Sequence, residues 1–538
     1  LLFEFDEKVL DFSSLARREK VSLSGVLRMT DENGRWLEEE IADYMKYRVP
    51  ELFASGSGLL KEAEQVKKAG DFRNLYDSCR KSGRAVRRLE KAAREVENSL
   101  LEMETCKNRF SNAASDESAS ALKRIARKLK KEFQDFPKLV EQFEQEIRRL
   151  EKENEESGFK TVEDETAAET LGQEISACGE VIKSAKERLQ RYREAETQVE
   201  RNLELLEEAC GYLEMEPDTD EEDDVDWDAI SQCADEMEIP ESENSGPKDA
   251  KKVAALERLE ELFDKELFEQ LLPAGTEVSG RAVSLNGIPS AGKHEIGSEN
   301  TGSGAMGILE TAEKELLVSK YIPLYFGSFT DGTGEADAAL DYEMEYLLSG
   351  KKSDRENLKE AVNKVLMLRG SMNLLYLLNS PDKKAEAEAL AAAVTAGIIP
   401  AQMAVSFLIL TLWAFGEAVL DVKTLLAGGR VSFWKTDATW KTGLSGLLDQ
   451  SFLGETAESG QDGRNYTEYL SCMMFFMDRG VRNFRMMDLI QWNIRMGQAD
   501  FSVASCAYQI EIEAEVMQKH MFFQKEEYRG TVHAAGSY

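Results

Sequence analysis

Three long stretches of the chain repeat their hydrophobic positions at alternating steps of three and four residues. The second stretch carries an apolar stripe from Leu122 to Leu150, and the third runs from Leu171 to Leu213 with Glu196 as its polar exception. Sustained heptads with charged flanks predict long α-helices that form a coiled coil. The first stretch consists of Val86, Leu89, Ala93, Val96, Leu100 and Met103.

Short polar segments separate these stretches. Ser111–Ser120 is a predicted turn, and Ser157-Gly158 ends the second stretch. Pro137 should kink or break the second helix, because proline lacks an amide donor. Short connections between long helices favour antiparallel packing, so residues 59–213 are predicted to form a three-helix stalk. At about 1.5 Å per residue, this stalk would be on the order of 70 Å long. The heptads equally allow self-association between chains.

The segments on either side of the stalk are predicted from composition. Residues 1–58 are expected to form short helices, followed by a turn over Ser55–Gly58. Residues 214–247 carry about fifteen acidic side chains and no basic one, which predicts a solvated linker. The run Asp218–Glu222 resembles the start of a calcium-binding loop. The glycine at the sixth position and the glutamate at the twelfth that such a loop needs are both absent.

The remainder is predicted to be compact and helical. We expect a helix over Lys251–Leu272, a series of helices from Glu313 to Gln498, and strands at Arg430–Trp434 and Phe501–Val516. The predicted fold class is therefore mainly α (α+β), with a long antiparallel coiled-coil stalk inserted into a compact helical domain with a small β-sheet. The predicted domains are an N-terminal helical segment on the base domain (1–58), the stalk (59–213), the acidic linker (214–247) and the compact C-terminal domain (248–538).

One long uncharged stretch, Ala389–Gly416, is a candidate for a membrane span or for a buried helix. It contains Pro400, Gln402, Ser406 and Thr411 and lacks flanking clusters of Lys and Arg. These features favour the core helix of a compact domain over a transmembrane helix.

Charge and cysteine content narrow the class of function. The net charge of −34 repels phosphates, which argues against a general nucleic-acid-binding protein. The seven cysteines include no C-x-x-C pair, so neither a disulfide framework nor a zinc site is predicted. Such cysteines are typical of a reducing compartment, although an exported domain of this size does not need disulfides.

No catalytic, cofactor-binding or metal-ligating residue is assigned from motifs. His294, His520 and His533 lack a sequence signature that supplies a catalytic partner, so each is expected at the surface. The run Ala291–His294 resembles the end of a phosphate-binding loop, but the glycine spacing and the Ser or Thr after the lysine are absent. No cofactor is predicted.

Carboxylates and aromatic side chains leave two alternatives open. Glu417 and Asp421 lie four residues apart on one predicted helix face, and Glu343 and Glu345 lie close to Asp341. Such groups act as an acid/base pair when a fold gathers them, but a buried carboxylate more often has a structural partner. The partner expected for Glu417 is Arg369 or Lys423. Conspicuous aromatic residues after position 321 are expected in the core, with a carbohydrate platform as the alternative.

A set of short motifs carries a resemblance to a known family. They are Tyr44–Arg48, Tyr321–Gly327, Leu340–Lys351, Ser353-Asp354, Leu368-Arg369, Leu412–Glu417, Leu425–Gly429, Asn465–Leu470 and Met487–Ile490. On these motifs, residues 1–50 and 260–515 resemble an uncharacterised extracytoplasmic domain family of Gram-positive bacteria that is encoded with tight-adherence (Tad/Flp) pilus machinery. Its members are similar to TadE/TadG-like minor pilins.

This resemblance implies a protein with one N-terminal membrane helix and a large domain outside the cell. We expect that helix to have preceded Leu1, so that the membrane contact is made only through a segment absent from this chain. The family has no established catalytic residues, so none are transferred. The expected partners are other pilus or cell-surface proteins.

The leading hypothesis is a non-enzymatic, membrane-anchored cell-surface subunit associated with a pilus. One alternative is an intracellular coiled-coil scaffold, and another is a carboxylate-dependent surface hydrolase. The hydrolase would require Glu343, Glu345, Glu417 or Asp421 to converge in a solvent-open cleft.

Overall fold

The computed structural model of the chain is mainly helical, as predicted, and it contains a small three-stranded antiparallel sheet. Internal contacts divide the chain into two compact units, which are described separately. One unit comprises Leu1–Val66, Gly275–Val362 and Asn465–Tyr538, and the other Lys67–Ala274 and Asn363–Arg464. The structure describes residues 16–48, 56–156, 165–213, 226–243, 249–264, 267–291, 305–331, 338–395, 397, 399–454, 463–475, 477–518 and 528–537.

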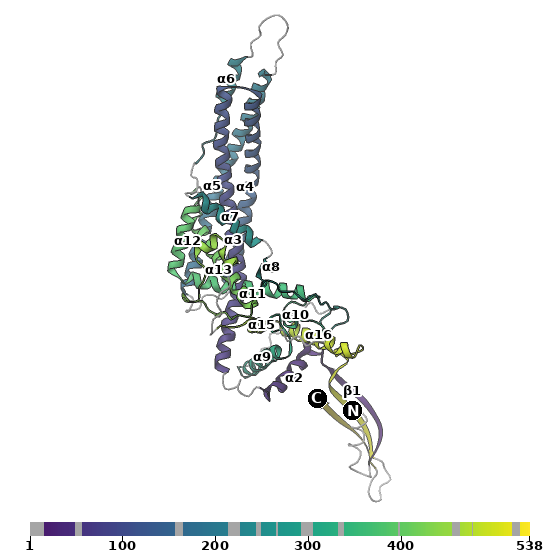
Figure 1. Ribbon diagram of the computed structural model, residues 1–538. Coiled ribbons are helices and arrows are strands. Elements are labelled where there is room, and N and C mark those ends of the chain that lie inside the picture. The colour runs from purple at the N-terminus through teal and green to yellow at the C-terminus, as the bar shows by residue number, and fades with distance from the viewer. Residues whose placement is uncertain are drawn as a thin grey trace. The chain divides into compact units, whose positions relative to one another are not determined.

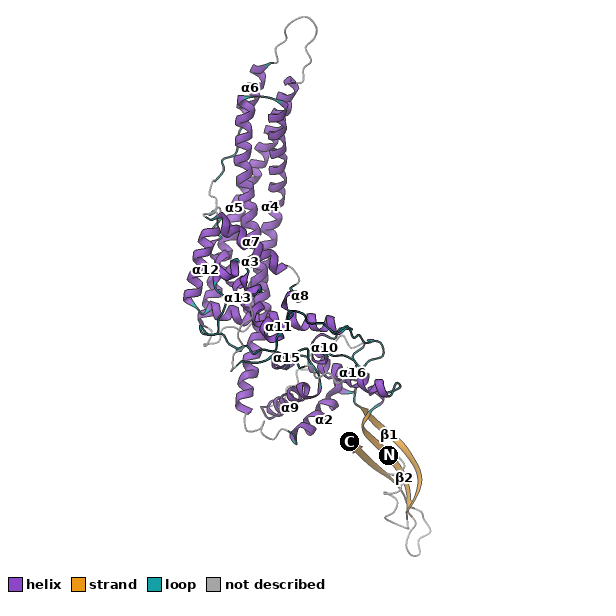
Figure 2. Ribbon diagram, viewed as in Figure 1, coloured by secondary structure: helices purple, strands orange, loops and turns teal. Residues whose placement is uncertain are grey.

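Three long helices form the stalk of the second unit and run side by side (Figures 1 and 2). They are α3 (Gly56–Asn112, in this unit from Lys67), α4 (Asp116–Glu156) and α5 (Glu165–Leu213). Ion pairs between α4 and α5 join Lys130 to Glu200 at 2.6 Å and Glu144 to Lys186 at 3.0 Å. Because one residue number rises as the other falls, these two helices are antiparallel, as predicted.

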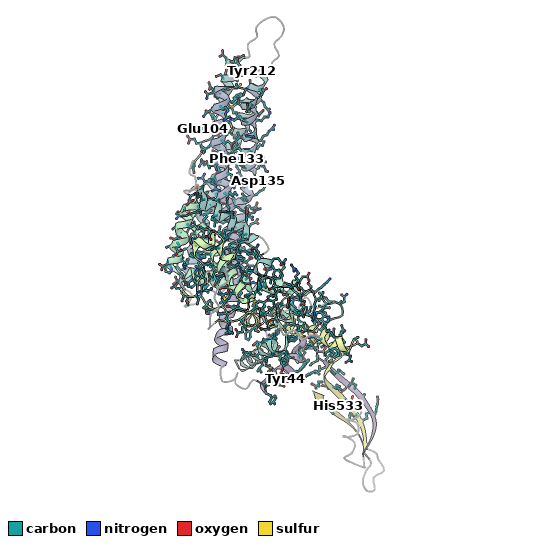
Figure 3. All side chains as sticks on the ribbon, in the orientation of Figure 1. Tyr44, Glu104, Phe133, Asp135, Tyr212 and His533 are labelled. Carbon is teal, nitrogen blue, oxygen red and sulfur yellow. The ribbon has the colours of Figure 1, made fainter. Side chains whose placement is uncertain are left out.

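The predicted heptad positions of α3 are buried, and so are those of α4 apart from Leu139, in whose place Val140 faces the core. Every predicted position of α3 from Val86 to Met103 is at most 2% exposed. A kink or a break was expected at Pro137, and helix α4 continues through this residue without a break. Phe133 and Phe136, buried on the preceding turn, pack against Tyr192 of α5 and hold this part of the helix in place. Charged residues such as Glu104 and Asp135 lie on the outer surface (Figure 3).

The buried face of α5 differs from the predicted one. Leu171, Cys178, Ala185, Tyr192, Val199 and Leu206 lie in the core as expected. The intervening predicted positions are only half-buried, because the residue before each of them faces the core instead. The core positions found in their place are Glu174, Val181, Arg188, Ala195, Asn202 and Ala209.

Part of the acidic segment is folded, although it was expected to be a solvated linker. Trp227–Glu236 forms helix α6, which packs on α5, and Met237 follows it into the core. A short amphipathic pattern within the acidic run explains this difference. Its buried members are Ile230, Cys233, Ala234 and Met237.

Shorter helices complete the second unit around α13 (Gln402–Leu426). By length and composition α13 qualifies as a membrane span among the described helices, but 94% of its most apolar window is buried inside the protein. It contacts α5, and Gly83 of α3 lies so close that a Cβ there would be 2.9 Å from Leu408. The other elements are α7 (Ala250–Asp264), α8 (Phe268–Leu271), α11 (Asp354–Leu378, in this unit from Asn363), α12 (Pro381–Val394), α14 (Leu444–Leu448) and η4 (Ser451–Leu453).

In its described residues, the first unit combines the sheet with helices. Strands β1 (Ala16–Arg28), β2 (Ala507–Gln518) and β3 (Tyr528–Ser537) pair in the order β1-β2-β3. Helix α2 packs on α9, and α10 packs on α15 and α16. The helical elements are η1 (Glu32–Gly34), α2 (Arg35–Lys46), α9 (Ala305–Tyr325), α10 (Glu343–Ser349), α15 (Tyr466–Met474) and α16 (Arg479–Gly497), with the 3-10 turn η5 (Val503–Ser505) before β2.

Two secondary-structure predictions were wrong. Residues 16–28 form strand β1 rather than a helix, with Val26 opposite Ile510 of β2. The local sequence did not indicate this strand, because the strand with which it pairs lies almost at the other end of the chain. The predicted strand Arg430–Trp434 is reduced to a single bridge between Val431 and Arg464. The predicted domain boundaries stay a prediction, since the grouping by contacts cuts across them without testing which part folds independently.

Candidate functional site

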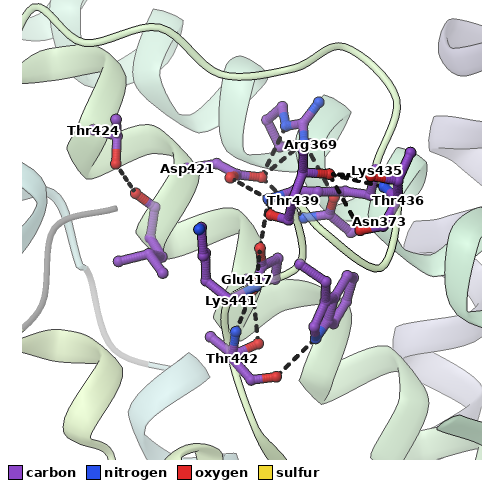
Figure 4. A network of polar contacts seen from close by, with 12 residues as sticks. Arg369, Asn373, Glu417, Asp421, Thr424, Lys435, Thr436, Thr439, Lys441 and Thr442 are labelled. Carbon is purple, nitrogen blue, oxygen red and sulfur yellow. Dashed lines mark hydrogen bonds and ion pairs between the residues drawn. The ribbon is translucent and has the colours of Figure 1, made fainter. Parts of the chain in front are cut away.

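Two of the singled-out carboxylates meet in a charged quartet inside the second unit (Figure 4). Arg369 of α11 donates from Nε and Nη2 to Oδ2 of Asp421 on α13, at 3.0 and 2.8 Å. Lys435, on the loop after α13, donates to Oδ1 of Asp421 at 2.7 Å and also to Oε1 of Glu417. None of the four side chains is more than 3% exposed.

The quartet fixes the loop that carries Lys435 onto two helices. Oε2 of Glu417 accepts from the backbone nitrogen and the hydroxyl of Thr442, both at 2.8 Å. The backbone nitrogen of Lys441 donates to Oε1 of Glu417 at 3.1 Å. At the other end of the loop, Nη1 of Arg369 donates to the carbonyl oxygen of Phe433 at 2.7 Å. Backbone atoms at both ends of the loop are therefore held by buried charges.

The electrostatics of the quartet favour a structural role. Burial alone would raise the pKa of Asp421, but the charges of Arg369 and Lys435 hold that pKa below its usual value. With all four groups ionised the formal charges cancel, which is the condition for retaining charges in an interior. Because the side chains are enclosed, the arrangement can hold a loop but presents no face to a substrate.

The sequence predicted part of this arrangement. Glu417 and Asp421 lie on one helix face and are buried with partners, and Arg369 is one of those partners, although it binds Asp421. Lys423 is not a partner of Glu417, since its amine donates to the carbonyl oxygen of Leu453. Lys435 was missed. A signal was present, because two carboxylates on an apolar helix favour cations as partners, and a lysine follows closely in the next loop.

The other two carboxylates, Glu343 and Glu345, lie at the start of α10 in the first unit. Glu343 accepts from the backbone nitrogen of Gly327 at 3.0 Å and from Nδ2 of Asn493 at 2.7 Å. Glu345 is fully buried and accepts from the backbone nitrogen of Phe329 at 3.0 Å. Burial raises the pKa of Glu345 to about 7. Both side chains therefore hold the chain segment that follows α9.

The structure thus encloses the singled-out carboxylates in two separate groups. Glu417 and Asp421 are paired inside one unit, and Glu343 and Glu345 are hydrogen-bonded inside the other. Asp341 lies nearer the surface and pairs with Arg281 at 3.0 Å. The hydrolase hypothesis required some of these groups to meet in a solvent-open cleft, and within each unit they are buried instead.

Aromatic residues beside the quartet pack against one another. The rings of Trp413 and Trp440 meet edge to face at 5.9 Å, and Tyr376 stacks on Trp440 at 5.1 Å. Both indole nitrogens donate to the carbonyl oxygen of Thr442, at 3.0 and 2.7 Å. These aromatic residues therefore pack in the core, as expected, rather than forming a carbohydrate platform, because both tryptophans are buried.

The histidines and possible metal ligands add no further site in the described part. His533 is exposed on β3, as expected, and lies 3.9 Å from Glu513 (Figure 3). His294 and His520 lie outside the described residues, as does Asp218–Glu222. Among the residues that the structure describes, no group of three or more His, Cys, Asp or Glu is placed to hold a metal ion.

Comparison with known proteins identifies the family. A family of unknown function (DUF5702) matches residues 245–518, about half of the chain. The chain belongs to the DUF5702 family. The DUF5702 match contains the quartet and the carboxylates of α10, whereas the stalk helices α3, α4 and α5 lie outside it. No curated protein and no solved structure matches the chain. The association of this DUF5702 member with a tight-adherence pilus stays a prediction.

Proposed function

We propose that this protein is a non-enzymatic structural subunit of the cell surface, anchored to the membrane and associated with a Tad/Flp-type pilus. In this role the stalk presents its surface to another pilus or cell-surface protein. The observation that carries the proposal is the stalk itself. Its three helices close a common core within one chain, so its charged outer surface is available to a partner.

The enclosed carboxylates support the non-enzymatic part of the proposal. Each group already has hydrogen-bond or ion-pair partners that fix a loop or a chain segment. A hydrolase would need at least one such pair free to meet a sugar or peptide. The pilus association rests on the resemblance of the sequence motifs to those of proteins encoded with such machinery.

An intracellular scaffold is the second candidate, and the cysteines favour it. All seven are free thiols, as in proteins of a reducing compartment. Both candidates use the stalk to meet a partner, so the location of the protein distinguishes them.

The first experiment is protease shaving of intact native cells. The protein is blotted in surface, sheared-appendage and cytosolic fractions, with a cytosolic enzyme as the control for lysis. The surface proposal predicts loss of the band on shaving and some protein in the sheared fraction. A band that is protected from protease and remains in the cytosolic fraction would reject the surface proposal in favour of the scaffold.

A further inference from the structure

An extended segment of the chain lies along the stalk, directly after α6. We call this segment, Met237–Glu243, the strap. Met237 is 1% exposed, and the amine of Lys107 on α3 donates to its carbonyl oxygen. The strap therefore begins with an apolar side chain inserted into the core and with a basic side chain bound to its backbone.

The next residue of the strap is recognised through its backbone alone. Nδ2 of Asn202 on α5 donates to the carbonyl oxygen of Glu238 at 2.7 Å. The backbone nitrogen of Glu238 donates in return to Oδ1 of Asn202 at 3.2 Å. Asn202 is 3% exposed and stands at a core position of α5. This pair of bonds resembles the contact between neighbouring strands, so it accepts an extended chain whatever the side chain at that point.

The end of the strap is recognised by its charge. Arg188 and Arg191 of α5 both donate to the carboxylate of Glu243. Hydrogen bonds from these two arginines hold the pKa of Glu243 below its usual value. The backbone nitrogen of Glu243 donates to Oε2 of Glu97 at 2.8 Å, and Oε1 of Glu97 accepts from Arg188 at 3.1 Å. Arg188 and Glu97 are 7% and 2% exposed, so this end of the groove is built from buried polar groups.

The strap does not fill the groove that it occupies. A cavity of about 660 Å³ lies beside it, bordered by Tyr192 and Gln198 of α5, by Leu100 of α3 and by the strap from Met237 onward. A segment that follows the same backbone path and carries larger side chains than the strap would therefore fit.

From these contacts we propose that the groove between α3 and α5 is a docking site for an extended acidic segment of a partner protein. The strap is the intramolecular competitor for this site. The partner segment has an apolar residue at its start, a carboxylate six residues later and an extended backbone between them. The proposal rests on the role proposed above, in which the stalk is the element that meets a partner.

Charge selects an acidic segment over a basic one. Three cationic side chains hold the strap in a chain whose net charge is −34, and the carboxylate that lies among them, Glu97, is itself bound to Arg188. Charge-assisted hydrogen bonds of this kind are roughly twice as strong as neutral ones. A tethered strap has an effective concentration in the millimolar range, so a free peptide competes well only when the strap is weakened.

The test uses a fluorescein-labelled synthetic peptide with the sequence of residues 235–243 and the full chain. One protein variant replaces residues 237–243 by a Gly/Ser segment of equal length, and another carries Glu243→Ala. The peptide should bind either variant with a Kd below about 100 μM, and wild type at least about tenfold more weakly. Circular dichroism checks that the helix content is unchanged, and Glu243→Ala alone serves if the replacement variant loses helix.

Matched peptides test whether the groove recognises its ligand as proposed. A peptide with Glu243→Gln should bind at least about tenfold more weakly, because it lacks the charge that Arg188 and Arg191 bind. A peptide with Glu241→Gln should bind as well as the original, because the described residues form no ion pair with Glu241. Adding Arg191→Ala to the strap variant should weaken binding to a similar extent.

Failure of both strap variants to bind the peptide would overturn the proposal, as would equal binding by the two matched peptides. Protease shaving reports only where the protein is located, and the peptide assay reports only what the groove binds. Failure of one proposal is therefore distinguishable from failure of the other.

Discussion

Removing the amine of Lys435 tests the role of the buried quartet directly. In Lys435→Met, the apolar stem stays, but Glu417 and Asp421 both lose a cation, and the net charge of the quartet falls from zero to minus one. Removing one partner of a buried ion pair costs about 3–5 kcal/mol of stability, because it leaves an uncompensated charge. Arg369 still neutralises Asp421, so the uncompensated charge lies mainly on Glu417. The loss of stability should therefore be about 3 kcal/mol, the lower end of this range.

A second substitution tests whether the loss comes from the uncompensated charge of Glu417. Adding Glu417→Gln to Lys435→Met removes the uncompensated charge, and it should recover more than half of the loss at pH 8.

Urea unfolding followed by tryptophan fluorescence measures these differences. Wild type and variants are compared in a background where Trp36, Trp227 and Trp492 are Phe, so the signal comes from the tryptophans around the quartet. A loss at pH 8 below about 1 kcal/mol, the value typical of an exposed ion pair, would refute the structural role of the quartet. A loss that is not reduced by adding Glu417→Gln would also refute it.

Three further changes have expected outcomes. Because the folded pKa of Glu345 is about 7 against 4.5 when unfolded, its contribution to stability is complete below about pH 4.5 and is lost as the pH rises to 7. Glu345→Gln should remove this dependence and, in urea unfolding, make the protein up to about 3 kcal/mol more stable than wild type at pH 8. Asn202→Ala should release the backbone of Glu238, seen as faster hydrogen exchange over residues 227–243 with unchanged helix content, and unchanged exchange would contradict the contact. Gly370→Ala places a methyl group 2.8 Å from the ring of Tyr76 and should lower stability by about 1–3 kcal/mol. Adding Tyr76→Leu should recover part of this loss. Full stability of the single variant would show that α11 and α3 are not so closely packed.

Local periodicity predicted the parts of the fold that depend on local pattern. The heptads of α3 and α4 and the apolar run of α13 were each sufficient to identify a helix, because burial along one face needs only the residues of that element. Strand β1 could not be found in this way, since its pairing partner is close to the other end of the chain. Helix α6 was hidden for a different reason. Four apolar residues within about fifteen acidic ones look like a solvated segment when composition is averaged.

The candidate site was only half predictable for a related reason. The carboxylates of Glu417 and Asp421 on an apolar helix indicate that cations must be near, but the sequence does not say which ones. Arg369 lies on another helix, and Lys435 lies on a loop whose position is set by the quartet itself. The identity of the cation, Lys435, and the conformation of its loop therefore depend on each other, and only the three-dimensional structure shows both.

The rotated face of α5 shows what a count of heptads leaves out. Glu174, Arg188 and Asn202 are spaced by fourteen residues, two heptads apart, and each takes the core position that an adjacent apolar residue was expected to fill. A polar residue at such a position is favourable only when it has a partner. Two of the three have that partner in the strap, through the backbone of Glu238 and the carboxylate of Glu243. The polar positions that weaken α5 as a coiled-coil helix are therefore the ones that make it a binding surface for an extended chain.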